Sequence, residues 1–379
     1  MKKNFLFLLI FLISLILVGC GKYNEKDLIN DLEKNIKKLN SYKLTGVLEI
    51  TNNDDTFQYD VDVSYKKDNN YRVSLVNKSN NHEQIILKNN EGVYVITPSL
   101  NKSFKFQSDW PNNNSQIYLL QSILNDIKSD NDKKFEEVDG KYILTTKVNY
   151  PNNNQLVKQK ITIDKDLKIC QIEVMDSNDI VQMIMKINSV DYGSDFNDDF
   201  FKLDSIVDDI DIDEKKNDKK ADDTKQNKNE DLKNQKENDT DSNQKTNDDT
   251  NNNSNENTTD NTKTTSTIDD IIYPLYIPIG TSLASKEKIA KTDGERVILT
   301  FDGEKPFLLV EETSTVNDEF SVIPTFGEPF FLTDTIGALT DKSLSWSSNG
   351  IDYYIVSDTI SQVELIEIAS SITAIPTIK

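Results

Sequence analysis

A run of 60 residues that is almost free of apolar side chains divides this chain of 379 and constrains its fold more than any other feature. Residues 208–267 contain no Pro, Gly or aromatic residue and consist mainly of Asp, Asn, Lys, Thr, Gln and Glu. Such a segment cannot bury enough apolar surface to offset its conformational entropy, so we predict a disordered acidic linker with a mean reach of about 45 Å. It is either a tether between two domains or a spacer without a binding role. Separate cores must therefore form in residues 20–207 and 268–379.

The first twenty residues have the pattern of a secretory signal that ends at a cysteine. A short basic head precedes an apolar run over residues 5–18. The ending Leu17-Val18-Gly19-Cys20 resembles the bacterial lipobox, in which the cysteine sulfur receives a diacylglyceryl group before cleavage on its N-terminal side. Residues 1–19 would then be the signal peptide, and two acyl chains on Cys20 would anchor the protein to a membrane. An uncleaved transmembrane segment is the alternative.

The composition is strongly acidic. Asp and Glu number 64 against 43 Lys and Arg, which gives a formal net charge of −21, and loss of residues 1–19 would take it to −23. Nucleic acid and anionic lipid headgroups repel a protein of this charge. We therefore expect no nucleic-acid partner, and the lipid anchor must supply the attachment to the cell membrane.

Cysteine usage leaves no internal disulfide. With Cys20 committed to lipid, Cys170 is the single remaining cysteine. It alternates with Ile172 and Val174, so we predict that it is a small buried residue on the same strand face. No His or Arg lies near it in the sequence to activate its thiol, so no reactive role is expected.

Segment 20–207 is predicted to be a helix followed by an antiparallel meander. Residues 25–40 place Leu28, Leu32 and Ile36 on one stripe, Asn24 is suited to cap this helix, and residues 115–127 show a second helical stripe. Period-two alternation predicts strands over residues 47–50, 57–63, 71–75, 84–87, 93–96, 142–148, 157–163, 168–175 and 181–187. We expect an α+β fold in which a curved antiparallel sheet, a half-barrel, wraps over helical lids.

Segment 268–379 is predicted to be a second, small α+β domain. Alternation predicts strands over residues 296–301, 307–312 and 351–356. A final helix is marked by Ser361 as N-cap and Glu364, which completes a capping box. Its expected buried stripe is Leu365, Ile366, Ala369 and Ile372.

Specific stretches carry a resemblance to a known family. They are Tyr71-Arg72-Val73, residues 84–89 and 92–98, and above all residues 100–111, Leu-Asn-Lys-Ser-Phe-Lys-Phe-Gln-Ser-Asp-Trp-Pro. With the helix-then-strands order, they resemble the LolA-like family of lipoprotein carriers and regulators, in particular the clostridial and bacillar sporulation lipoproteins. The C-terminal segment, with Trp346, Gly350 and residues 353–355, resembles a domain of unknown function that ends extracytoplasmic anti-sigma and sporulation proteins.

The resemblance implies a LolA-like fold and a binding role outside the cytoplasm. Germination lipoproteins of the GerS type, which belong to this group, bind and activate a spore-cortex amidase, whereas LolA carriers hold acyl chains. Both lack the long linker and the second domain, so neither role transfers directly. A LolA-like domain followed by a smaller one is also similar in architecture to RseB-type stress sensors, which bind an anti-sigma factor.

The sequence offers little chemistry for an enzyme. His82 is the only histidine and lies in the polar turn 79–83, where we expect a surface residue with no nucleophile beside it. No Cys/His cluster suits a transition metal, and the acidic runs 195–199 and 208–213 lack the spacing of a calcium loop. We therefore expect a protein that is not an enzyme, with no metal and no cofactor beyond the diacylglyceryl group on Cys20.

The candidate site residues are Phe104, Phe106 and Trp110, which border the predicted helix 115–127. Core packing is the first interpretation of this aromatic cluster. The second is the mouth of an apolar cavity, which the LolA resemblance would fill with acyl chains. The third is an exposed anchor for a protein partner.

Two functions from different classes follow. The favoured hypothesis is a membrane-anchored lipoprotein that binds and positions or activates a protein partner, such as a cell-wall amidase, in sporulation or germination. The alternative is a carrier or sensor of lipid acyl chains, or a regulator of an anti-sigma factor. The expected location is the outer face of a Gram-positive-type cell membrane, with the space between the forespore membranes as a variant. A cavity filled by the protein's own side chains would count against the carrier.

Overall fold

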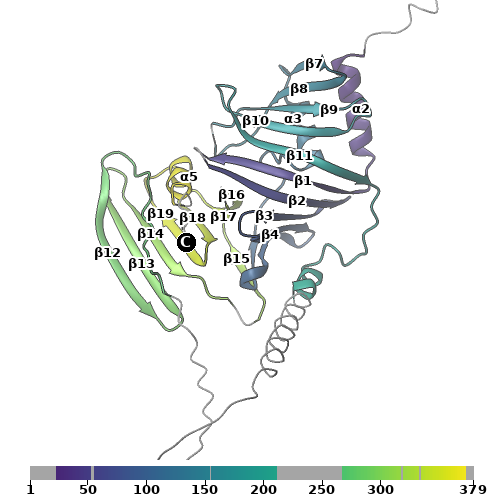
Figure 1. Ribbon diagram of the computed structural model, residues 1–379. Helices are drawn as coiled ribbons and strands as arrows, with labels where there is room; N and C mark the ends of the chain where they lie inside the picture. Colours follow the sequence, from purple (N-terminus) through teal and green to yellow (C-terminus); the bar gives the residue numbers. More distant parts are fainter. Residues whose placement is uncertain are drawn as a thin grey trace, which may run out of the picture.

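The computed structural model describes residues 23–52, 55–153, 155–210, 267–316, 319–332 and 334–372. The predicted signal peptide with Cys20, and all of the predicted linker except residues 208–210 and 267, lie outside the described residues. Two open sheets with helices packed against them make up the described part of the chain (Figure 1). The predicted α+β class, with a LolA-like antiparallel sheet followed by a smaller α+β unit, is confirmed.

Twelve strands form the first sheet, and eleven of them come from the N-terminal segment. In spatial order they are β15 (Ser321–Thr325), β6 (Lys102–Phe106), β5 (Gly92–Thr97), β4 (Glu83–Asn89), β3 (Asn70–Asn77), β2 (Asp55–Lys66), β1 (Ser41–Asn52), β11 (Val181–Tyr192), β10 (Ile169–Met175), β9 (Lys158–Ile163), β8 (Lys141–Lys147) and β7 (Lys134–Val138). The predicted strands are confirmed, whereas β6 and β7 were not predicted. β15 comes from the C-terminal segment and pairs with β6 in parallel.

The helix α2 (Glu25–Lys37) begins where the sequence predicts. The Asn24 side chain accepts hydrogen bonds from the N–H groups of Lys26 (2.9 Å) and Asp27 (3.2 Å), and the Asp27 carboxylate accepts one from the Asn24 N–H. This reciprocal arrangement is a capping box. The helix turns its apolar stripe of Leu28, Leu32 and Ile36 toward the sheet.

The second helix, α3 (Leu120–Ser129), begins five residues later than the predicted residue 115. Ser115 is held instead by the neighbouring loop, because its N–H donates to the Asn149 carbonyl and its hydroxyl accepts from the Asn149 N–H, both at 2.8 Å. The Gln116 N–H donates to the Ser122 hydroxyl at 2.7 Å. Because these hydrogen bonds satisfy the backbone N–H groups of residues 115 and 116 without a helix, α3 is shorter than the apolar pattern that predicted it.

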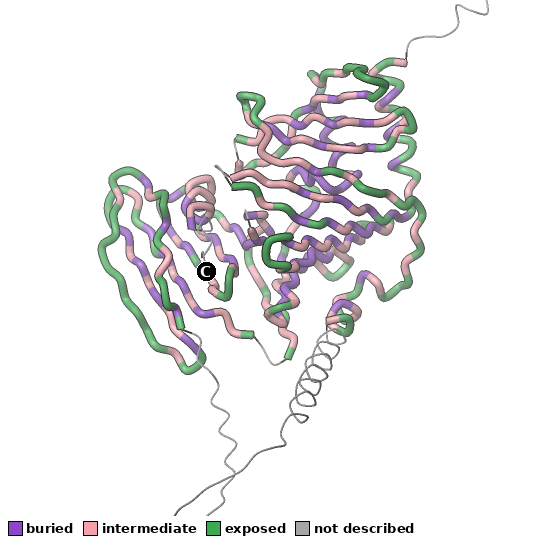
Figure 2. Tube along the Cα trace, viewed as in Figure 1, coloured by how far each residue is buried: buried purple, intermediate pink, exposed green. Residues whose placement is uncertain are grey.

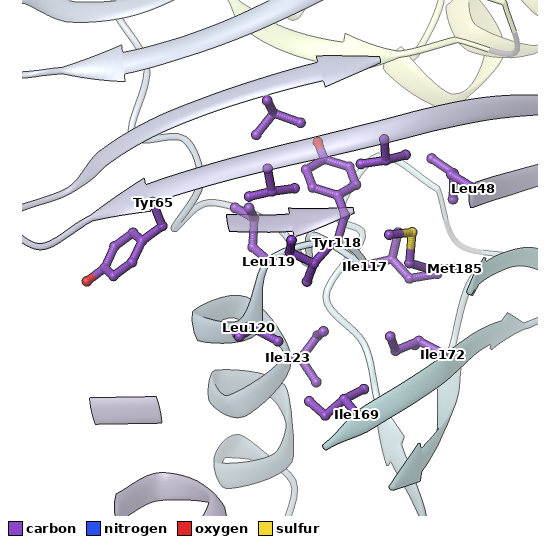
Figure 3. Packing of buried hydrophobic residues seen from close by; sticks show 14 of the residues in the cluster. Leu48, Tyr65, Ile117, Tyr118, Leu119, Leu120, Ile123, Ile169, Ile172 and Met185 are labelled. Atoms are coloured by element: carbon purple, nitrogen blue, oxygen red, sulfur yellow. The ribbon is translucent and has the colours of Figure 1, made fainter. Parts of the chain in front are cut away.

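Helices α2 and α3 fill the inner face of the first sheet. Side chains of α3 and of the irregular segment before it interdigitate with those of the strands (Figure 3). Leu119, Leu120 and Ile123 come from the helical side, and Leu48, Ile172 and Met185 come from the sheet, and all are buried. This cluster is the main core of the protein.

A smaller apolar cluster covers the outer face of the same sheet. Phe201 and Ile206 pack on Ile85 and Tyr94 of β4 and β5. Residues 203–210 are helical, so the predicted linker begins with three residues that belong to this ordered cover. Arg72 lies over the Phe200 ring at 5.0 Å. This cation–π contact helps to fix the residues that follow β11 to the sheet.

Cys170 corrects an expectation of the sequence analysis. It lies where the β9–β10 register shifts between Ile169 and Gln171, and it is half-buried, whereas Ile169, Ile172 and Val174 are buried. A bulge adds one residue to a strand and breaks its alternation, so Ile169 takes the inward position. The prediction that Cys170 shares the buried face was therefore wrong.

Seven strands form the second sheet, which is antiparallel throughout. In spatial order they are β12 (Thr281–Lys291), β13 (Gly294–Gly303), β14 (Phe307–Thr313), β19 (Ile351–Val356), β18 (Ser343–Ser348), β17 (Ile336–Leu339) and β16 (Glu328–Phe331). Helix α5 (Gln362–Ser370) packs on one face and has the predicted capping box of Ser361 and Glu364. Its buried residues are Leu365, Ile368 and Ala369, so Ile368 replaces the predicted Ile366, which is half-buried. The edge strand β12 is exposed along most of its length (Figure 2).

Candidate functional site

The protein's own side chains fill most of the inner face of the first sheet, and core residues such as Leu48, Trp110 and Tyr118 also line a small cavity beside it. Trp110, Ile117 and Tyr118 lie under α3 and are at most 5% exposed. The Trp110 ring meets the Tyr71 ring edge-on at a centroid distance of 5.8 Å. The close fit of these rings is that of a packed core.

The three candidate aromatic residues lie in two different environments. Trp110 is part of the main core. Phe106, which is 3% exposed, and the half-buried Phe104 point from β6 to the same inner face and line a cavity with residues of the second sheet. None of the three is exposed. Phe106 is part of the main core as well, so the half-buried Phe104, which packs against that core, is the one of the three that differs in burial.

Two cavities lie where the N-terminal and C-terminal segments meet. The first has a volume of about 180 Å³. Ile50 and Met183 of neighbouring strands line it on one side, and Phe330, Phe331 and Ile366 line it on the other. The amide side chains that border it are Asn52, Asn114, Gln116, Asn153, Gln155 and Gln182. Its walls are therefore apolar and its rim is built from neutral amides.

The second cavity has a volume of about 260 Å³ and lies beside the β6 edge. Phe104 and Phe106 line it from the first sheet, Ile323 from β15, and Ala338 and Tyr354 from the second sheet. Lys102, whose side chain is 8% exposed, reaches Asp352 of the second sheet at 3.6 Å. The interface between the sheets thus contains a cavity in addition to its direct contacts.

Direct contacts hold the interface in a defined geometry. The Gln84 side-chain oxygen accepts hydrogen bonds from the Ile336 N–H (2.7 Å) and the Thr335 hydroxyl (3.2 Å). The Glu328 carboxylate accepts one from the Asn113 amide (2.7 Å) and one from the Ser108 hydroxyl. We call these six residues, with Lys102 and Asp352, the junction contacts. They show that the C-terminal segment packs on the N-terminal sheet through specific polar groups.

One position in the sequence could have indicated these contacts. Gln84 opens the apolar run Ile85-Ile86-Leu87, where a polar side chain needs a hydrogen-bond partner if it is buried. Its partners are more than 250 residues away, so their identity could not be read from local pattern.

Burial shifts the pKa values of two groups whose side chains carry unpaired atoms, Asp334 and His82. Burial raises the pKa of Asp334, whose carboxylate accepts a hydrogen bond from the Ser348 hydroxyl at 2.5 Å. His82 is half-buried, and burial lowers its pKa; its Nδ1 lies 3.5 Å from the Ser99 hydroxyl. No group of three or more His, Cys, Asp or Glu side chains in the described ranges could hold a metal ion.

The described acidic residues of the runs 195–199 and 208–213 are mostly paired with cations. Asp198 lies 3.4 Å from Lys66, and Asp209 lies 3.4 Å from Arg72.

Among the described residues, no helix has both the length and the apolar character needed to cross a bilayer.

Comparison with known proteins identifies the family. The model of the YdcC-like sporulation proteins matches residues 1–201. The sporulation protein YdcC of Bacillus subtilis (strain 168) is 34% identical over 372 residues, which cover 98% of this chain and 97% of that protein. The chain belongs to the YdcC-like sporulation protein family. This agrees with the resemblance to sporulation lipoproteins that the sequence carries.

Solved structures show more distant likenesses to this YdcC-like protein. The MucA/MucB complex of Pseudomonas aeruginosa contains a chain that is 10% identical, with 90% of this chain and 96% of that chain covered, at a TM-score of 0.28. The complex of the CwlD amidase with the GerS lipoprotein of Clostridioides difficile gives 17% identity, with 47% and 97% covered, at 0.17. A lipoprotein-sorting domain of Vibrio parahaemolyticus gives 8%, with 47% and 96% covered, at 0.26. At such TM-scores we draw no functional argument from them.

Proposed function

We propose that this YdcC-like protein is a lipid-anchored, extracytoplasmic protein that binds a protein partner during sporulation. The family places the chain in sporulation. The lipobox-like ending at Cys20 supports anchoring to the outer face of the cell membrane through a diacylglyceryl group. In this proposal the protein has a binding role and no catalytic one.

The observation that carries the choice of partner is the small size of the cavities that the packed inner face of the first sheet leaves. A carrier of acyl chains needs an apolar cavity, and pockets for ligands of moderate size are about 300–1,000 Å³. The two cavities have volumes of about 180 and 260 Å³, both below that range, and six amide side chains border the first. These dimensions support recognition of a protein surface over storage of lipid.

The class of partner follows from the sequence resemblance and from charge. Sporulation lipoproteins of the type that this sequence resembles act on a cell-wall amidase, so a cell-wall hydrolase is the first partner to seek. An anti-sigma factor is the second. With a formal net charge of −21, the chain favours a basic partner surface and gains association rate from it.

The experiment is partner capture in the protein's own host. The full chain with a C-terminal tag is cross-linked in sporulating and in vegetative cells, and bound proteins are identified by mass spectrometry. The Cys20→Ala variant is the control for anchoring. We expect one protein at near-equal abundance in sporulating cells, and its loss or at least a tenfold decrease with Cys20→Ala. Equal capture from both cell states, or none from either, would contradict the proposal.

A further inference from the structure

The strand β15 is added to the first sheet from a distant part of the chain. Its residues Ser321–Thr325 pair in parallel with Lys102–Phe106 of β6, and Ile323 stands opposite Phe104. Every other pair among the described strands is antiparallel. β15 thereby covers backbone groups of β6 that would otherwise form a free sheet edge (Figure 1).

Few side-chain contacts hold β15 in place. None of the five residues of β15 is buried. In β5, which lies on the other side of β6, five of the six residues are buried. Val322 is 44% exposed, and Ile323 borders the 260 Å³ cavity instead of a close-packed core. Pro324 has no N–H to donate to the ladder, and parallel pairs are slightly weaker than antiparallel ones. Backbone hydrogen bonds therefore carry most of the attachment.

The residues on either side of β15 allow it to leave without the rest of the second sheet. Val316 is 61% exposed and Phe326 is 83% exposed, so each flank is in contact with solvent. The junction contacts of Gln84 with Ile336 and of Lys102 with Asp352 involve other strands and can remain. Phe320 is the one flanking residue that packs on the outer apolar cluster.

We propose that the β6 edge is a strand-binding site for the protein partner, and that β15 occupies it until a partner strand replaces it. The inference rests on the proposed function and assigns it a place in the fold. Addition of an extended segment to a sheet edge is a common mode of peptide recognition, in which main-chain hydrogen bonds give affinity and side-chain positions give specificity.

β15 itself shows the chemistry that this edge accepts. The occupant is an extended segment with a branched apolar side chain opposite Phe104, where Ile323 now lies. Side chains at the alternate positions face the other side of the sheet, as Val322 does beside Ser103, and tolerate exposure to water. An apolar side chain larger than Ile323 would also fill part of the adjoining cavity and so compete well with β15.

The test locks β15 onto β6 by a disulfide. Ser103→Cys and Val322→Cys are introduced together, with Cys170→Ser, into the full chain in detergent; the register makes the two cysteines neighbours. The probe is a fluorescent peptide with the sequence of residues 319–326, measured by anisotropy. We expect the reduced form to bind it and the oxidised form to bind at least tenfold more weakly. Equal binding by the two forms, or no binding by the reduced form, would overturn the inference.

A second measurement needs no engineered cysteine. Hydrogen exchange of the wild-type chain should be at least tenfold faster for amides of residues 321–325 than for those of residues 93–97 in β5. Similar protection of the two strands would overturn the inference. Both assays work without the cellular partner. If they fail, the β6 edge is not a strand-binding site, and the proposed function is still tested by the capture experiment. If the capture experiment fails, strand exchange at β6 is unaffected.

Discussion

At the scale of residues, two buried carboxyl groups should make the protein less stable as the pH rises. Burial raises the pKa of Asp126 from 3.8 to about 6 and that of Glu311 from 4.5 to about 7. Each keeps a hydrogen-bond donor, the Gln159 amide at 2.9 Å and the Ile272 N–H at 3.1 Å. Because their folded pKa values exceed the unfolded ones, the fold favours the protonated forms. Their contribution is complete below about pH 4 and is lost as the pH rises through 6 to 7.

Replacement of Asp126 by Asn should remove part of this pH dependence. The amide keeps an oxygen for Gln159 and carries no charge at any pH. At pH 8 we expect the free energy of unfolding of Asp126→Asn to exceed that of wild type by about 2 kcal/mol, with little difference at pH 4. Urea denaturation at both pH values measures this. The exposed Asp166→Asn is the control; the prediction is wrong if both variants change stability alike.

The two kinds of aromatic position should differ in their contribution to stability. Trp110 is 2% exposed and packs in the main core, whereas Phe104 is half-buried beside a cavity. Trp110→Ala should lower the free energy of unfolding by about 3–5 kcal/mol, and Phe104→Ala by clearly less, since less of the Phe104 side chain is buried. Chemical denaturation of the two variants gives the comparison. If both substitutions lowered the free energy of unfolding equally, the difference in packing between Phe104 and Trp110 would be contradicted.

At the scale of elements, helix ends were the most predictable features because their signals are local. Asn24 before α2 and Ser361 with Glu364 before α5 cap the helices as expected. The start of α3 could not be predicted, because Ser115 bonds to Asn149, 34 residues away. Local capping chemistry can be read from the sequence, whereas competition from a distant loop cannot.

The N-cap of α2 gives a test at this scale. Asn24→Ala removes the acceptor for two helix N–H groups and should lower the free energy of unfolding by about 1 kcal/mol. Asn24→Asp keeps the acceptor and adds a negative charge at the helix N-terminus, so its stability should be near that of wild type. Thermal and urea unfolding distinguish the two. Equal losses for both variants would show that the cap does not stabilise this helix.

Strands were predictable from regular alternation of buried and less buried residues, and strands with no buried residue left no such pattern. β3 alternates between buried and half-buried residues and was found from its pattern. β12 is exposed along most of its length, and β15 has no buried residue, so neither leaves a period-two apolar signal. Cys170 shows the same limit, because a bulge shifts the alternation by one residue.

At the scale of the whole molecule, the junction between the two sheets lay beyond prediction. A long polar linker indicates two independent domains, yet β15 joins the first sheet and Glu328 contacts Asn113. Such pairings join residues more than 200 positions apart and depend on the folded shapes of both partners. Of the candidate site, the sequence indicated Phe104 and Phe106, but it did not indicate the residues from the C-terminal segment that complete the cavity.

The junction should loosen when its central hydrogen bonds are removed. Gln84 is 6% exposed and accepts from Ile336 and Thr335, so Gln84→Ala leaves a buried N–H without this acceptor. We expect a loss of about 1–3 kcal/mol in the free energy of unfolding. Hydrogen exchange should accelerate in residues 321–339 and stay unchanged in β13. The exposed Gln58→Ala is the control, and unchanged exchange at the junction would contradict the assignment.

The central claim is that this YdcC-like protein binds another protein and does not carry lipid. Native mass spectrometry of the full chain, purified gently from sporulating cells of its own host, tests it most directly. The account predicts an added mass of several tens of kilodaltons, that of a stoichiometric protein partner, beyond the mass of the anchor on Cys20. Added masses of lipid size on the Cys20→Ala variant, with no protein bound to the wild-type chain, would contradict it.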